Sequence, residues 1–550
     1  MKNARLLHIL LITGLGLALV FICGFSYRYG WQWLDSDNSA EMVLGKLLAD
    51  ENVLVSVNWL YSTEIRLIYQ TIFTMPLFKL FGGLENWALV RSLNILLNNV
   101  LLILSYIFMM KGLRIQLKWV LGSAFFLLLP LSIFYWDIVT FGGFYVFLVI
   151  QLFISLGLFT RIVYGSGTSK IKTIYLILFL ALAFCLGIQS IRSLLAVQIP
   201  LLLACFFLWR KQNIRNIAVG GFGFAACCAG YGLNKILHFW YSFKSFEDMR
   251  IDNIFSNFTQ KLGRCFTAVI EYFGFSVGGS FFSLNGIFSM VSIIITFIFL
   301  YLVFKAFMRA RPTDAGMKIQ QNSLIQLPPE HYFMIVFFVC SFALNIFIFM
   351  MVDQQIVNRY FIPFLVLSVP LAAILFQYIS KAYSRLKVIA IVSVIVLFIF
   401  GQGCVNFVNL AGKNLNSIRN GYIQYLLDNE LFFGFAVHKN TVMTTEMSNG
   451  KIELASLDAR IRTGSESGAF IMFDSLMKIK FSDSSKLLDP SFKPHRSAYE
   501  GESFILLDRD DWELTRRRRY FIGVAPDYED VNFVILRFPS ALVIYRDLIL

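Results

Sequence analysis

The chain has 550 residues, of which 57% are hydrophobic and 58 are Phe. Soluble domains are only about 45–50% apolar, so this composition excludes an ordinary soluble protein. The formal net charge of +14 does not indicate nucleic-acid binding, because the excess Lys and Arg lie in short loops between apolar runs and form no groove-reading basic face. None of the eight Cys residues lies in the polar C-terminal part, which excludes a disulfide framework there.

Apolar runs of about 18–25 residues recur up to residue 411, and each can cross a bilayer core of roughly 30 Å. The first run, Leu6–Tyr27, lacks a small-x-small cleavage motif and is too long for a signal-peptide core, so we expect an uncleaved anchor. Basic loops stay on the cytoplasmic side. Eleven spans with a cytoplasmic N-terminus put these basic loops inside: Lys111–Lys118, Arg161–Lys172, Arg210–Arg215, Lys305–His331 and Lys381–Lys387.

The predicted fold is therefore an all-α polytopic membrane protein of about 11 transmembrane helices, with a small extracytoplasmic α/β domain. We expect a membrane domain over residues 1–411, with a long first outer loop at 28–86, and a second domain over 412–550. Within the loop, Ala40–Asp50 has the apolar spacing of a helix. Ile65–Phe81 is amphipathic and is expected to lie in the membrane interface.

The C-terminal part combines one helical pattern with several strand patterns. Ile418–Leu427 has helical spacing, and turn formers such as Ser448-Asn449-Gly450 separate the later segments. Alternating or apolar segments favour strands at Phe432–Val437, Lys451–Leu457, Phe504–Leu507, Phe521–Val524, Asn532–Phe538 and Ala541–Tyr545.

Three carboxylates, Asp35, Asp37 and Glu41, fall within seven residues just after the first span. Paired carboxylates can act as a general base and can bind a divalent metal through oxygen. In the alternative, structural interpretation, Asp37 or Ser39 caps a helix that begins near Ala40. The residues alone leave both interpretations open.

This loop resembles the first outer loop of the GT-C glycosyltransferases, which include protein O-mannosyltransferases and aminoarabinose transferases. Those enzymes carry an Asp-led acidic motif here, often followed by a helix that contains Ala-Glu. Counting back from Ala40-Glu41, Asp35 takes the position of the leading Asp. The usual Asp-Glu pair is replaced by Asp35-Ser36-Asp37, so the resemblance makes both Asp35 and Asp37 candidate catalytic residues.

A second stretch of the loop, Asn58-Trp59-Leu60-Tyr61-Ser62-Thr63-Glu64, resembles uncharacterised bacterial proteins of this type. The resemblance implies that Glu41, Tyr61 and Glu64 contribute to substrate binding. The resemblance covers the order of spans, the first loop and the C-terminal part.

Asp137 lies in the next outer loop, within Phe134-Tyr135-Trp136-Asp137. In oligosaccharyltransferase-type relatives this loop supplies metal-binding acids, which implies Asp35 and Asp137 as ligands of a divalent metal, Mg or Mn. The alternative is a lone interfacial acid beside aromatic residues of the membrane belt.

Arg192 and Arg359 are basic residues on the predicted outer side, where the positive-inside rule does not require them. A lipid phosphate needs cations at headgroup depth, and Arg binds phosphate in a bidentate manner. We therefore predict that both bind substrate. The alternative for each is snorkelling toward phospholipid headgroups.

The longest predicted inner loop, Lys305–His331, is too short to fold around a nucleotide sugar. Together with acids on the outer side, this predicts an inverting transfer from a polyprenyl-phosphate sugar to a cell-envelope acceptor (glycan, lipid or protein), at the outer face of a bacterial cytoplasmic membrane. A transporter or flippase is the main alternative. Transporters place ionisable groups near the bilayer midplane and often show repeated halves. A catalytically silent scaffold is a third possibility.

Overall fold

The computed structural model of the chain contains two compact units. Unit 1 comprises Met1–Gly24, Ile95–Ile236 and Phe246–Gly412, and unit 2 comprises Phe25–Asn94, Leu237–Ser245 and Lys413–Leu550. The described residues are 2–57, 59, 61, 65–129, 132–143, 145–208, 214–241, 243, 257–275, 280, 282–309, 327–351, 358–382, 384–457, 459–464, 468–473, 501–516, 521 and 523–544.

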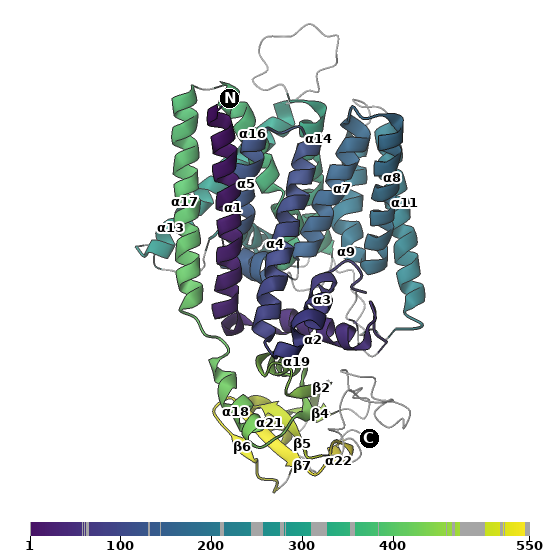
Figure 1. Cartoon of the computed structure of the whole chain (residues 1–550), viewed down its shortest axis with the longest axis vertical. Helices are drawn as coiled ribbons and strands as arrows, with labels where there is room; N and C mark the ends of the chain where they lie inside the picture. Colours follow the sequence, from purple (N-terminus) through teal and green to yellow (C-terminus); the bar gives the residue numbers. More distant parts are fainter. Residues whose placement is uncertain are drawn as a thin grey trace. The chain divides into compact units, whose positions relative to one another are not determined.

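Unit 1 is built from long apolar helices (Figure 1). Among the described residues, nine helical segments have the length and hydropathy to cross a membrane, or ten if the bent pair Leu117–Leu128 and Ile133–Phe141 forms one span. The shorter apolar segment Ile191–Phe207 lies where one more of the eleven expected spans falls, between Ser169–Gln189 and Asn216–Leu237. These observations confirm the predicted fold class, a multi-pass helical membrane protein.

The helices that build unit 1, wholly or in part, follow one another along the chain. They are α1 (Lys2–Tyr29), α4 (Trp87–Gly112), α5 (Leu117–Leu128), α6 (Ile133–Tyr135), α7 (Val146–Tyr164), α8 (Ser169–Gln189), α9 (Ile191–Ser193), α10 (Ile199–Phe207), α11 (Ile214–Leu237), α12 (Phe258–Tyr272), α13 (Leu284–Arg309), α14 (Pro329–Met351), α15 (Ile362–Leu365), α16 (Ser368–Ala382) and α17 (Arg385–Ala411).

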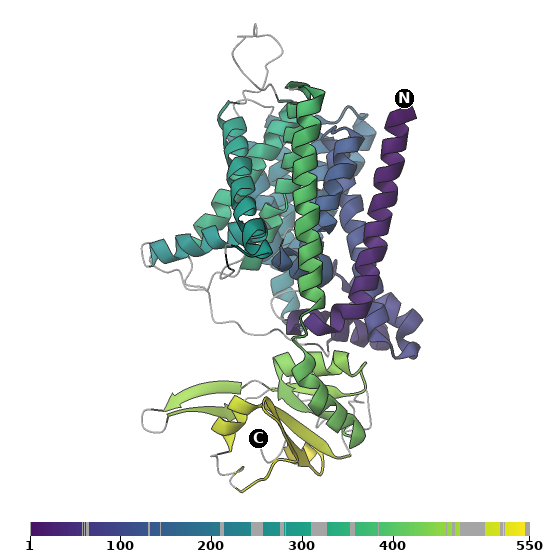
Figure 2. The ribbon, with the colours of Figure 1, turned by 90° about the vertical axis from the view of Figure 1, so that its left-hand side faces the viewer.

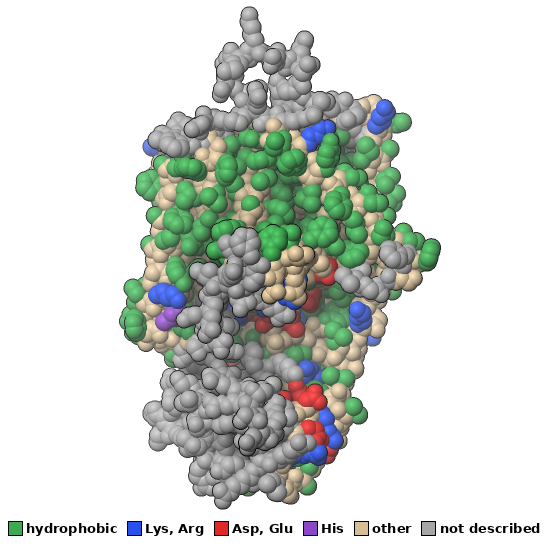
Figure 3. Space-filling model, turned by 180° about the vertical axis from the view of Figure 1, so that it is seen from behind, with side chains coloured by type: hydrophobic (Ala, Val, Ile, Leu, Met, Phe, Trp, Pro, Cys, Tyr) green, Lys and Arg blue, Asp and Glu red, His purple; other side chains and the backbone are tan. Residues whose placement is uncertain are grey.

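The surface of unit 1 carries many exposed apolar side chains, which Figure 3 shows as broad green areas. Leu17 and Val20 on α1 are each 67% exposed. Such a surface is unfavourable in water and expected against lipid, where hydrocarbon replaces the missing protein contacts. Inside the unit, α8 and α11 approach closely: a Cβ at Gly187 would lie 2.0 Å from the Cys227 carbonyl oxygen. Small residues permit such backbone contact between membrane helices.

In unit 2, the long loop after the first span folds into α2 (Ser36–Glu51) and α3 (Thr71–Phe81). The helix α2 begins four residues earlier than its apolar spacing predicts, and it is followed by the C-cap residue Asn52, which has a left-handed backbone with φ 59°. Gly45 permits close crossing with α3, because a Cβ there would lie 2.3 Å from the Thr74 Oγ1. The stretch predicted to be amphipathic from Ile65 becomes helical only at Thr71.

The C-terminal part of unit 2 is an α/β fold with a five-stranded sheet in the order β2-β1-β5-β7-β6. The strand β1 pairs in parallel with β2 and β5, whereas β7 is antiparallel to β5 and β6. A separate hairpin, β3–β4, is visible beside the sheet in Figure 2. The strands are β1 (Phe433–Val437), β2 (Glu453–Leu457), β3 (Ala459–Gly464), β4 (Gly468–Phe473), β5 (Ser503–Asp508), β6 (Tyr528–Glu529) and β7 (Phe533–Phe538).

Helices α18 (Asn420–Asp428), α19 (His438–Met447), α21 (Arg509–Thr515) and α22 (Ala541–Ile544) complete this part. Tyr422 and Leu426 of α18 pack with Phe504 and Ile535 of the sheet in one buried cluster. The expected strand at Ala541–Tyr545 is wrong, because its described residues form α22. A short apolar run does not by itself distinguish strand from helix.

Candidate functional site

Asp35 caps the N-terminus of α2. Its carboxylate Oδ1 accepts the backbone N–H of Asn38 at 2.7 Å, and its carbonyl oxygen accepts the N–H of Ser39 at 3.0 Å. The cap is therefore Asp35, and the expectation that Asp37 or Ser39 fills this role is wrong; Asp37 lies in the first helical turn. A carboxylate accepts hydrogen bonds at about four positions. Capping is thus compatible with a second, chemical role for exposed Asp35.

The backbone preceding Asp35 is bonded to the start of the C-terminal part of the chain. The amide of Asn416 donates to the carbonyl oxygens of Trp31 and Leu34, at 3.0 and 3.1 Å. The indole N–H of Trp33 donates to the Lys413 carbonyl oxygen at 2.9 Å. These bonds hold the turn that leads into Asp35 from its N-terminal side.

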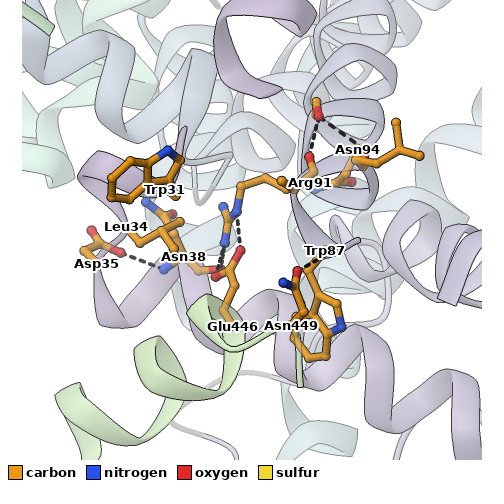
Figure 4. A network of polar contacts seen from close by, with 12 residues as sticks. Trp31, Leu34, Asp35, Asn38, Trp87, Arg91, Asn94, Glu446 and Asn449 are labelled. Carbon is orange, nitrogen blue, oxygen red and sulfur yellow. Dashed lines mark hydrogen bonds and ion pairs between the residues drawn. The ribbon is translucent and has the colours of Figure 1, made fainter. Parts of the chain in front are cut away.

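A buried ion pair lies beside the first turn of α2 (Figure 4). The guanidinium of Arg91, on α4, donates through Nε and Nη2 to the two carboxylate oxygens of Glu446, on α19. Its Nη2 also donates to the carbonyl oxygen of Asn38 at 3.2 Å. Asn38 is the residue whose N–H Asp35 caps. Neither charged partner is among the residues predicted from sequence, although Arg91 is visible there as a cation inside an apolar run.

The other acids and the tyrosine predicted in the first loop have different surroundings. Glu41 is only 1% exposed and forms an ion pair with Arg66 inside unit 2. Tyr61 is 2% exposed, and its hydroxyl accepts the N–H of Ser56 at 3.1 Å. Burial raises the pKa of Tyr61 well above its ordinary value. Glu64 lies outside the described residues.

In unit 1, the two predicted arginines contact the same aromatic ring. The guanidinium carbons of Arg192 and Arg359 lie 5.5 and 6.0 Å from the ring centroid of Tyr360. Arg192 also donates to the hydroxyl of Tyr145 at 3.4 Å. We call Tyr145, Arg192, Arg359 and Tyr360 the Arg–Tyr cluster. It brings together two cations that are 167 positions apart in sequence (359 minus 192).

A carboxylate borders this cluster. Asn358, next to Arg359, donates its side-chain amide to Glu271 at the end of α12. Burial raises the pKa of the Glu271 carboxyl. Glu271 is absent from the residues predicted from sequence, where its signal is weak: one acid at the end of an amphipathic stretch.

Asp137 lies in a π-helical turn, η3 (Trp136–Phe141), and a second π-helical turn, η4 (Leu194–Gln198), begins two residues after Arg192. Such turns are rare and are often found at functional sites. The two turns are linked through Tyr145, whose N–H donates to the carbonyl oxygen of Ile138 at 3.2 Å and whose hydroxyl accepts from Arg192.

The described part of the chain contains no group of three or more His, Cys, Asp or Glu side chains arranged to hold a metal. Asp35 belongs to unit 2 and Asp137 to unit 1. Mg²⁺ usually binds through one or two carboxylates together with waters and substrate phosphates. The carboxylates of Asp35 and Asp37 are of the right type for such a site, whereas a closed all-protein site is not present among these residues.

No family model matches the sequence, and no curated protein matches it. The fold is similar to the crystal structure of ArnT from Cupriavidus metallidurans bound to undecaprenyl phosphate, with a TM-score of 0.55, 11% identity, and coverage of 96% of this chain and 98% of ArnT. The apo state of ArnT gives a TM-score of 0.46, at 12% identity and the same coverage. ArnT is an aminoarabinose transferase of the GT-C glycosyltransferases. The chain therefore shares the fold of ArnT over nearly its whole length.

Proposed function

We propose that this protein is an inverting GT-C glycosyltransferase that moves a sugar from a polyprenyl-phosphate donor to a cell-surface acceptor. The observation that carries the proposal is the ArnT fold over 96% of the chain, because the similar structure binds undecaprenyl phosphate. The placement of Asp35 at an exposed helix start just after the first span supports it.

The Arg–Tyr cluster is the proposed binding site for the donor phosphate. Two guanidinium groups beside one ring supply positive charge and bidentate donors that match phosphate oxygens. The ring of Tyr360 holds the cations by cation–π attraction. As the leaving group gains negative charge in the transition state, the arginines stabilise it.

Asp35 is the proposed general base. It takes the proton of the acceptor hydroxyl while the acceptor oxygen bonds to the anomeric carbon on the face opposite the phosphate. The bond between that carbon and the phosphate oxygen breaks, and its electron pair leaves with polyprenyl phosphate. The anomeric configuration is inverted. Asp37 orients Asp35 in this scheme, or takes over as base.

A divalent metal, Mg or Mn, is a further proposal for the same reaction, held by Asp35 together with Asp37 of the same unit. Whether Asp137, which belongs to unit 1, is a ligand stays a prediction from sequence. Treatment with EDTA, followed by adding back each metal, tests it. Loss of transfer that Mg²⁺ or Mn²⁺ restores supports the metal. If the rate of transfer does not change, the arginines alone stabilise the charge of the leaving phosphate.

The donor class is tested with purified protein. It is incubated with an acceptor mixture and either a polyprenyl-phosphate sugar or the matching nucleotide sugar without lipid carrier. We expect acceptor-dependent release of polyprenyl phosphate, measured by mass spectrometry. Turnover of the nucleotide sugar alone would show that the proposal is wrong.

A further inference from the structure

We propose that Glu446 is a positioning residue for Asp35, acting through Arg91 and the backbone of Asn38. The C-terminal part of the chain then contributes to catalysis, although its own residues do not touch the reacting atoms. The inference rests on the proposed role of Asp35 as general base.

The ion pair is built for a fixed orientation. Arg91 and Glu446 are each 5% exposed, and both guanidinium donors Nε and Nη2 meet the one carboxylate. A two-point contact between planar groups fixes direction as well as distance. Because water is nearly excluded, neither charge can turn toward solvent without losing its partner.

One residue, Asn38, separates the guanidinium from the Asp35 cap. Its Nη2 donates to the Asn38 carbonyl oxygen at 3.2 Å, and the Asn38 N–H donates to the Asp35 carboxylate at 2.7 Å. A shift of Arg91 therefore moves the residue to which the Asp35 side chain is bonded. Glu446 sets the direction of Arg91. The path from Glu446 to the Asp35 carboxylate therefore passes only through Arg91 and Asn38.

Docking of α19 does not depend on this pair alone. The side chain of Asn449 accepts the N–H of Trp87 at 3.0 Å, and a Cβ at Gly450 would lie 2.6 Å from the Trp87 ring. Val442 of α19 packs into the same buried cluster as Leu44 and Leu47 of α2. Buried ion pairs are often replaceable by apolar residues without loss of stability. An apolar pair at these two positions can preserve stability, but it cannot donate a hydrogen bond to the Asn38 carbonyl oxygen as Arg91 does.

The test compares two variants with one matched control. Glu446→Gln removes one charge, and Arg91→Met with Glu446→Leu replaces the pair by apolar side chains of similar volume. The control is Glu85→Gln, which breaks the exposed pair Lys451–Glu85 at 3.1 Å between the same two regions. Transfer kinetics, thermal midpoint and amide hydrogen exchange of Asn38 and Ser39 are measured for each.

We expect both variants to lower kcat by about 10²-fold, the cost of a small misplacement of a reacting group, with the donor KM nearly unchanged. The exchange of the Asn38 and Ser39 amides should rise in both, and Glu85→Gln should match wild type. If Glu446→Gln fails to fold, the kcat and the amide exchange of the apolar double variant still test the proposal. Wild-type kcat in a folded double variant, or unchanged exchange at Asn38 and Ser39, overturns the proposal.

The exchange measurement also separates this inference from the proposed function. If the wild type transfers no lipid-linked sugar but exchange at Asn38 and Ser39 rises in both variants, the proposed function fails while the coupling from Glu446 to Asp35 stands. If the wild type transfers sugar and exchange does not change, the coupling fails and the function stands.

Discussion

In unit 2, the residues around Asp35 are fixed by hydrogen bonds of 2.5 to 3.2 Å, several from positions more than 300 residues away, such as Asn416 to Leu34 and Arg91 to Glu446. In unit 1, the Arg–Tyr cluster is joined by a hydrogen bond from Arg192 to the Tyr145 hydroxyl at 3.4 Å and by cation–π contacts of both guanidinium groups with the Tyr360 ring. A general base needs a set direction toward one proton, whereas a cation attracts a phosphate from many directions.

This difference assigns different kinetic roles to the two regions. Changes near Asp35 should act on kcat, because they alter the transition state alone. Changes in the Arg–Tyr cluster should act largely on the donor KM, because charge attraction is already present when the donor binds. This assignment would be wrong if a change near Asp35 altered mainly the donor KM, or if a change in the Arg–Tyr cluster altered mainly kcat.

The largest effect is expected for Asp35→Asn. The amide keeps the size of the side chain and an oxygen that can accept the Asn38 N–H, but it has no basicity. We expect kcat to fall by about 10²–10⁴-fold, with a change in stability below the ~1 kcal/mol that loss of a cap costs. Near-normal transfer by folded Asp35→Asn and Asp37→Asn proteins would remove the catalytic assignment from this segment. If only Asp37→Asn is inactive, Asp37 is the base.

A smaller effect is expected for Arg359→Gln. Losing one hydrogen bond to a charged group costs roughly 1.5–3 kcal/mol, so the donor KM should rise by about 10- to 100-fold while kcat changes less. The control is Lys118→Gln, which removes an exposed cation elsewhere in unit 1. An equal rise in the control would mean that general surface charge, and not the cluster, attracts the donor.

The ring of Tyr360 should contribute less to donor binding than Arg359 does. Tyr360→Phe keeps a ring under both arginines and is expected to bind donor almost as wild type. Tyr360→Leu removes the cation–π contact, which is worth about 0.5–2 kcal/mol, and should raise the donor KM several-fold. Equal KM values for the two variants would show that the ring does not hold the cations.

The smallest effect concerns Glu271, whose pKa is raised by burial. Because its folded-state pKa lies above the unfolded value, the folded protein binds more protons in the window between the two, so stability falls as pH rises through it. Relative to Glu271→Gln, the wild-type thermal midpoint should be highest at acidic pH and decline above the ordinary carboxyl range. A midpoint difference that grows with pH would contradict the burial effect.

The local parts of the structure were predictable from sequence. Hydropathy predicts the spans, and alternating or apolar segments predict β1, β2, β5 and β7. Each of these patterns depends only on which side chains of a single helix or strand face lipid or the protein core. The acidic pattern also indicates the Asp35 segment, although it favours Asp37 or Ser39 as the cap, whereas Asp35 is the cap in the structure. Phe521–Val524 was expected as a strand, but its described residues form a turn.

The contacts that define the candidate site were less predictable. The pairing of Arg91 with Glu446 joins residues 355 positions apart, and no local periodicity reports it. The burial of Glu41 against Arg66 was missed for a related reason: an acid on a half-apolar helix has the same sequence pattern whether it faces solvent or a buried cation.

We propose that unit 2 carries the acid–base chemistry on the outer face of the membrane. The most direct measurement uses proteoliposomes in which Ser417→Cys, an exposed position of unit 2, reports orientation by labelling with an impermeant reagent. Acceptor is supplied on one side at a time, and transfer is measured for each orientation. We expect transfer only when acceptor is on the side where Ser417→Cys is labelled. Transfer only from the opposite side would contradict the claim.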